Sequence, residues 1–127
     1  MTARRTDVLV DQIERGLPFK ALESLEDKSG LSVGIIASVL GIAERTLARR
    51  KAAGTLAPDE SGRLLRVATV FEKAVELFEG DVAGAVTWLT TPKNALGHET
   101  PLEFSRTELG AREVENLIGR LEHGVFS

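Results

Sequence analysis

The sequence predicts an all-α protein with about eight helices, and three observations support this. Apolar residues recur at three- or four-residue spacing along most of the chain, as Leu9 and Ile13 do near its start. Glycines fall where these periodic segments end, which is the usual place of a helix C-cap. The sequence contains no alternating strand pattern. The 127 residues, 43% apolar and 28% charged, have the composition of an ordinary globular protein.

The expected helices cover residues 5–14, 18–28, 33–39, 43–53, 58–79, 82–90, 101–107 and 111–122. Pro58 suits the first turn of the longest helix, because its missing amide hydrogen would be unpaired there in any case. Asp81 is expected to cap the next helix. Thr100 and Glu103 are expected to form a capping box in which each side chain accepts from the other's amide. The intervening stretch 91–101 is expected to be a loop.

Gly110 and Glu113 are expected to bracket the start of the last helix. A division into two parts is expected between Gly54 and Pro58, which separates residues 1–57 from 58–127. Residues 1–66 carry 11 basic and 9 acidic side chains, and residues 67–127 carry 5 and 10. The first part is therefore suited to phosphate and the second to another partner, although chance clustering on a solvated surface has the same pattern.

Residues 33–50 match a helix-turn-helix by physical criteria. Ala37 is small enough for two helices to cross closely, and Gly41 supplies the positive φ of the turn four residues later. The side chains expected to face inward around this turn are Leu40, Ile42, Ala43 and Leu47. The second helix is thereby expected to direct its polar side chains outward.

The outer face of that second helix is basic. Arg45, Thr46 and Arg49 are spaced to lie side by side, in the arrangement of a recognition helix that enters a major groove. Arg50 and Lys51 are expected at the rim, where they would hold phosphates. The alternative is an ordinary helical hairpin with a solvated basic face.

The composition excludes several chemistries. Without cysteine there are no disulfides, thiol nucleophiles or cysteine metal sites. His98 and His123 are too few for a zinc cage, and His98 beside Glu99 has no accompanying nucleophile, so we expect no catalytic residue, cofactor or metal. Neither a signal peptide nor an apolar run of about 18 residues occurs, which favours a cytoplasmic protein with no membrane contact.

Two features of the second part have two interpretations each. Trp88 is either a core tryptophan or a partner contact. After Gly124 the last helix cannot easily continue, so Val125, Phe126 and Ser127 are expected to form a short tail. Phe126 either folds back and closes the core or is covered by a partner, because an exposed phenylalanine is costly in water.

Six short motifs occur in a specific order along the chain. They are RTLARR at 45–50, RLLR at 63–66, WLTTP at 88–92, ALG at 95–97, TPL at 100–102 and GRLEHGV at 119–125. Together they resemble the Xre/MbcA/ParS antitoxins, the partners of RES-domain toxins in bacterial type II toxin–antitoxin operons. The resemblance extends from residue 16 to the end of the chain. One departure is Gly62 in the long helix, where glycine costs about 1 kcal/mol relative to alanine.

The resemblance implies an all-helical antitoxin with a DNA-binding region over 1–57 and a toxin-binding domain over 58–127. In that family the toxin degrades NAD, and the carboxy-terminal end of the antitoxin blocks its active-site cleft. The antitoxin also dimerises and represses its own operon. The positions carried over are Arg45, Thr46 and Arg49 for the groove, and Gly124, Val125, Phe126 and Ser127 for the cleft, with Trp88 as a further toxin contact.

Two more expectations complete this interpretation. A homodimer is expected to bind an inverted repeat in the promoter, because two half-sites multiply the affinity of one helix-turn-helix. The alternative function is a stand-alone helix-turn-helix regulator without a toxin partner. An enzyme is not expected, because the sequence has no nucleophile constellation and no Gly-rich phosphate loop.

Overall fold

A computed structural model describes the backbone of residues 5–124 and the side chains from Val10 onward. Its helices are α1 (Arg5–Arg15), α2 (Lys20–Ser29), α3 (Val33–Val39), α4 (Glu44–Ala53), α5 (Pro58–Leu77), α6 (Val82–Leu89), the 3-10 helix η1 (Asn94–Leu96), α7 (Pro101–Phe104) and α8 (Glu108–Glu122). Over residues 5–124 the chain forms no strand, and Pro18 and Thr55 meet only in an isolated bridge. The predicted all-α class is confirmed.

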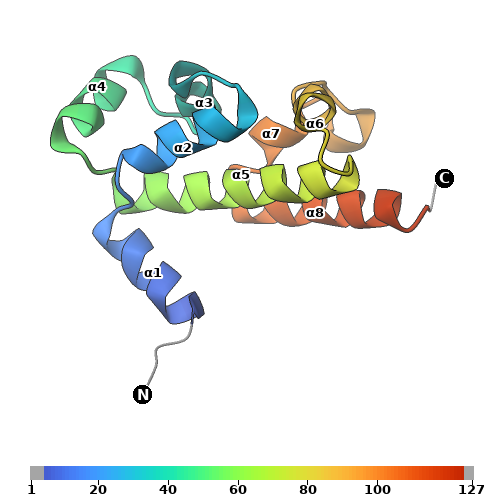
Figure 1. Ribbon diagram of the computed structural model, residues 1–127, viewed down its shortest axis with the longest axis horizontal. Coiled ribbons are helices and arrows are strands. Elements are labelled where there is room, and N and C mark those ends of the chain that lie inside the picture. The colour runs from blue at the N-terminus through green and yellow to red at the C-terminus, as the bar shows by residue number, and fades with distance from the viewer. Residues whose placement is uncertain (1–4, 125–127) are drawn as a thin grey trace.

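The 20-residue helix α5 is the axis of the molecule (Figure 1). Helix α8 packs along it, while α2, α3 and α4 gather near its start and α6 and α7 near its end. Helix α1 leaves the body beside the start of α5. This arrangement places α4 and the carboxy-terminal end of α8 at opposite ends of the molecule (Figure 1).

The buried apolar side chains form one continuous cluster. Every third or fourth residue of α5 is buried, and α8 contributes a matching stripe. The buried apolar side chains of these two helices are Leu64, Val67, Val70, Phe71, Ala74, Ala111, Val114 and Ile118. Leu56 and Leu64, on either side of the expected division at residue 57, belong to the same cluster. The two parts therefore share a core, and the division stays a prediction about function.

Helix α5 begins at Pro58, as expected. The Glu60 carboxylate accepts a hydrogen bond of 2.8 Å from the backbone amide of Ala57, which satisfies one free donor at the helix start. The helix runs through Gly62 without a break. It ends at Leu77 rather than residue 79, because Glu79 takes a left-handed conformation at φ 53°.

The start of the last helix differs from the prediction. Helix α8 begins at Glu108, three residues earlier than expected, and Thr107 is its N-cap, with the Thr107 hydroxyl accepting from the amide of Gly110 at 3.0 Å. Gly110 therefore lies inside the first turn, and Glu113 lies further along the helix. A Cβ at Gly110 would overlap the carbonyl oxygen of Phe104, so glycine is required here by close packing and not as a helix stop.

The segment before that helix also differs. The expected loop contains η1, whose Leu96 is buried and whose 3-10 turn closes through the Leu96 amide and the Lys93 carbonyl at 3.0 Å. Helix α7 ends at Phe104 instead of residue 107. The hydroxyl of Thr100 accepts from the amide of Glu103 at 3.1 Å, as predicted, but the Glu103 carboxylate accepts from that hydroxyl at 3.2 Å and not from the amide.

The cap of α6 is confirmed, since the Asp81 carboxylate accepts from the amide of Gly84 at 3.0 Å. None of the helices within residues 5–124 has the length and apolar content needed to cross a membrane.

Candidate functional site

The turn between α3 and α4 has the hydrogen bonds of a Schellman motif. The amide of Ile42 donates to the carbonyl of Ala37 at 2.8 Å, and the amide of Gly41 donates to the carbonyl of Ser38 at 3.0 Å. Gly41 lies between these bonds with φ 76°, in the left-handed region. The predicted helix-turn-helix geometry is therefore present, with the glycine where the turn requires it.

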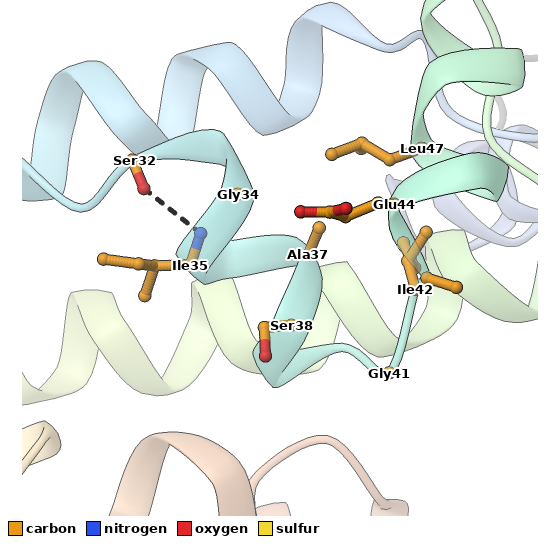
Figure 2. A pocket seen from close by; sticks show the side chains of 10 residues that line it. Ser32, Gly34, Ile35, Ala37, Ser38, Gly41, Ile42, Glu44 and Leu47 are labelled. Carbon is orange, nitrogen blue, oxygen red and sulfur yellow. Dashed lines mark hydrogen bonds between the residues drawn. The ribbon is translucent and has the colours of Figure 1, made fainter.

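Helix α4 packs on α3 through few apolar contacts. Ala37 and Ile42 are buried, and Leu47 is half-buried. A cavity of about 660 Å³ lies between the two helices, and Figure 2 shows Ala37, Leu47 and Glu44 directed toward it. In Figure 2 the side chain of Ile35 points away from α4, and it is 51% exposed.

The expected inward position of Ala43 is wrong. Ala43 is the N-cap of α4, in an extended conformation at φ −67° and ψ 152°, and it is exposed. The side chain of an N-cap residue does not follow the helical period, because its backbone is not yet helical. The period that places Leu47 inward therefore does not apply to Ala43. Glu44 follows in the first turn, where its negative charge interacts favourably with the positive end of the helix dipole.

The outer face of α4 carries the predicted recognition residues. Arg45 and Arg49 are exposed one turn apart, and Thr46 is half-buried beside them. Arg49 Nη2 donates a hydrogen bond to the Thr46 hydroxyl oxygen, at an N–O distance of 3.4 Å. Lys51 is also exposed. These four side chains can reach a surface that approaches α4 from solvent.

Arg50 differs from this group. Its Nε donates to Glu60 Oε1 at 2.8 Å and its Nη2 donates to Oε2 at 3.2 Å, so that the guanidinium and the carboxylate form a two-bond pair. The Glu60 side chain is only 7% exposed and that of Arg50 is 27% exposed. Arg50 is therefore paired within the chain, and its expected contact with phosphate stays a prediction.

The pairing shifts both titrations. Burial acts to raise the pKa of the Glu60 carboxyl, but the hydrogen bonds from Arg50 and from the Ala57 backbone outweigh it and hold that pKa below its ordinary value. The hydrogen bond with Glu60 raises the pKa of Arg50. Both groups are therefore charged at neutral pH.

Trp88 has a mixed environment on α6. It is half-buried and packs against the core, and the ammonium of Lys93 lies 5.1 Å from the centroid of its ring. Burial lowers the pKa of Lys93. The indole thus contributes to packing and keeps an accessible part, so the two interpretations of Trp88 remain.

The carboxy-terminal end of α8 lies at one end of the molecule (Figure 1). His123 is the C-cap, and Gly124 is exposed and left-handed at φ 67°. The predicted end of the helix is therefore confirmed. Val125, Phe126 and Ser127 lie outside the described residues.

One exposed apolar side chain was missed by the sequence reasoning. Leu109, in the first turn of α8, is 69% exposed beside a cavity of about 230 Å³ that is also lined by Phe104. Glu99, Glu103 and Glu113 border the same cavity. The signal was Thr107 as an N-cap, which would have placed Leu109 in the first turn of the last helix. Among the described side chains, those of residues 10–124, no group of three or more histidine and acidic residues is arranged to hold a metal.

Two family models match the chain. The "Antitoxin Xre-like helix-turn-helix domain" matches residues 8–68, and the "Antitoxin Xre/MbcA/ParS C-terminal toxin-binding domain" matches residues 73–124. The first range ends and the second begins inside α5, which therefore contributes to both.

Three curated relatives are each named "Antitoxin Xre". The protein from Yersinia enterocolitica is 43% identical over 128 aligned residues, which cover all of this chain and 86% of the relative. The protein from Photorhabdus laumondii is 39% identical over 91% of this chain and 78% of its own length. The protein from Pseudomonas putida is 33% identical over 54% of this chain and 43% of its own length. The chain therefore belongs to the Xre/MbcA/ParS family of antitoxins, with a helix-turn-helix domain followed by a toxin-binding domain.

Proposed function

We propose that this antitoxin represses its own operon and blocks the active site of a cognate RES-domain, NAD-degrading toxin. One observation carries the proposal: an exposed pair, Arg45 and Arg49, on the second helix of a helix-turn-helix, in a chain whose other part matches a toxin-binding domain. Both activities then reside on opposite ends of α5.

In the DNA complex, Arg45, Thr46 and Arg49 read base edges in the major groove. An arginine that pairs with guanine through two bonds contributes about 1–3 kcal/mol of discrimination against the wrong base. Lys51 contacts phosphate and adds affinity without sequence preference. Arg50, which is paired with Glu60, is not included among the contacts.

A homodimer presents two such helices to an inverted repeat. One helix-turn-helix covers a single half-site, and a second one about 34–36 Å away engages the same side of the duplex. Because the second half-site is bound at high effective concentration, the dimer gains affinity without a new kind of contact.

In the toxin complex, the carboxy terminus is the blocking element. Helix α8 ends at Glu122 and Gly124 is exposed, which supports a tail that leaves the body at this end. Residues 124–127 enter the cleft of the toxin, with Phe126 as the apolar anchor and the Ser127 carboxylate toward groups that bind the phosphates of NAD. Trp88 adds a contact outside the cleft.

The test uses the full chain and the product of the neighbouring gene of its operon, which we expect to be a RES-domain toxin. We expect the two proteins to co-purify, and the antitoxin to restore NAD levels in cells that express the toxin. A footprint on the promoter of the operon should cover two half-sites related by a two-fold axis. A footprint over a single asymmetric half-site, or a toxin that stays active in the presence of the antitoxin, would contradict the proposal.

A further inference from the structure

Arg50 and Glu60 join the last turn of α4 to the first turn of α5, ten residues apart in sequence. Two hydrogen bonds of 2.8 and 3.2 Å connect the guanidinium to the carboxylate. The same Glu60 Oε1 accepts a third bond from the backbone amide of Ala57 at 2.8 Å. The carboxylate is thus fixed by its own helix start on one side and by the recognition helix on the other.

Residues 17–19 form backbone hydrogen bonds with the segment that connects α4 to α5. The amide of Leu56 donates to the carbonyl of Leu17 at 2.9 Å, and the amide of Phe19 donates to the carbonyl of Gly54 at 3.0 Å. Ser61, beside Glu60, accepts from the amide of Leu17 at 2.8 Å. The two bonds to Leu17 fix the position of Glu60 relative to the body without involving α4, whereas the bond from Phe19 holds only the C-cap of α4, Gly54.

Helix α4 itself has few apolar anchors. No side chain of α4, which is described in full, is buried, and Leu47 is only half-buried. An open pocket of about 660 Å³ lies between α3 and α4, so part of their facing surfaces is not in contact. A two-bond pair with a buried carboxylate is then a large share of what orients α4.

We infer that Arg50 is a positioning residue, whose pairing with Glu60 sets the angle at which α4 presents Arg45 and Arg49 to DNA. The inference rests on the proposed role of α4 in DNA binding. Arg50 does not act as a phosphate contact, because its guanidinium is engaged with Glu60 and the neighbouring carboxylate offsets its positive charge.

The geometry also explains the residue type. The planar guanidinium offers two parallel N–H groups to the two carboxylate oxygens, whereas a lysine ammonium offers a point charge on a flexible stem. A lysine at position 50 would keep a positive charge available to phosphate but would lose the two-bond fork. Arg50→Lys therefore separates a positioning role from a phosphate contact.

The experiment measures the Kd of the full chain for its operator at several salt concentrations, for the variants Arg50→Lys, Glu60→Gln and the double variant. We expect each single variant to weaken binding by about tenfold with an unchanged dependence on salt. The double variant should bind no more weakly than the weaker single variant, because both changes remove one shared interaction. The matched control Lys51→Met should reduce the slope of log K against log salt by about 0.9.

A phosphate contact predicts a different set of results. Arg50→Lys would then bind like the original chain, Glu60→Gln would bind equally or more tightly, and the two effects would add. Any of these outcomes overturns the inference. Circular dichroism and thermal melts identify a variant that has unfolded. Because Arg50→Lys and Glu60→Gln are conservative changes, we expect both variants to remain folded.

Hydrogen exchange of the free protein separates failure of this inference from failure of the proposed function. If the original chain does not bind its promoter, the DNA-binding role of α4 is wrong. The positioning role is then still tested, because Arg50→Lys and Glu60→Gln should each speed amide exchange in residues 47–53 by about tenfold while the amides of α8 stay unchanged. Unchanged exchange in residues 47–53 would overturn it. Arg45→Ala, as a control, should not alter exchange there.

Discussion

The amide of Ile42 donates a 2.8 Å hydrogen bond to the carbonyl of Ala37, five residues earlier, and this bond closes the turn that directs α4 away from α3. The chain can make it only because Gly41, between the two residues, is left-handed at φ 76°. The direction of the basic face of α4 thus depends on one backbone conformation in addition to the pairing of Arg50.

Gly41→Ala should destabilise the protein. A Cβ at this position would meet no atom within 4 Å, so the cost is conformational and amounts to about 1–2 kcal/mol for a left-handed alanine. Gly62→Ala is the matched control, because Gly62 is helical and a Cβ there would lie 3.6 Å from a guanidinium nitrogen of Arg66, an ordinary contact. It should stabilise by about 1 kcal/mol. Urea denaturation of both variants measures the difference, and equal effects would refute this account of the turn.

Gly110→Ala should destabilise for a different reason. The added Cβ would overlap the Phe104 carbonyl oxygen and lie 2.8 Å from the Thr107 hydroxyl, so the α7–α8 junction would have to move. We expect a loss of about 1–3 kcal/mol in the free energy of unfolding. Leu109→Ala, on the neighbouring exposed position, should change it by less than about 0.5 kcal/mol. An unchanged free energy of unfolding in Gly110→Ala would contradict this account, because the α7–α8 junction would then accommodate the added Cβ.

The pH dependence of stability should depend on Glu60. Burial acts to raise the pKa of Glu60, but the hydrogen bonds from Arg50 and from the Ala57 backbone outweigh it, so the net pKa lies below the ordinary value. The unfolded chain therefore binds a proton at Glu60 more readily than the folded chain, so the pairing stabilises above about pH 4.5, the ordinary value, and this contribution is lost as the pH falls through the folded pKa. Glu60→Gln should flatten that part of the stability curve. An unchanged acid limb in the variant would contradict the assignment.

Arg45 and Lys51 should have different effects on DNA binding. Arg45→Ala should abolish the preference for operator over random DNA, because it removes a base-reading side chain. Lys51→Ala should weaken binding to both DNAs alike and reduce the salt dependence. Competition binding against operator and random duplexes compares them. Equal effects of the two variants on both DNAs would show that the reading face of α4 is assigned wrongly.

The helices were predictable because their signals are local. Pro58, Asp81 and Gly41 act through their own backbone or the next turn, and each occurs where the sequence analysis expected it. The role of Gly110 was not predictable, because a glycine required by a close backbone approach cannot be distinguished in the sequence from one that ends a helix. Only the packing of α7 against α8 distinguishes the two.

The candidate site was likewise predictable only where its signals are local. The exposure of Arg45 and Arg49 follows from the helical period once the turn is recognised. The pairing of Arg50 with Glu60 does not, because it depends on the angle at which α4 meets α5. The local half of that signal was present, since Glu60 occupies the third position of a helix that begins at Pro58.

Deletion of residues 124–127 tests most directly whether the carboxy terminus blocks the toxin. The measurement is survival of cells that express the cognate toxin together with either the full chain or the truncated chain, at matched antitoxin levels. Leu109→Asp, which alters the exposed apolar position on α8 and leaves the tail intact, is the control for a wider contact surface. The truncated chain should keep its helical circular dichroism and its operator affinity but fail to rescue the cells, whereas the full chain rescues them. Rescue by the truncated chain, or its unfolding, would contradict the blocking role.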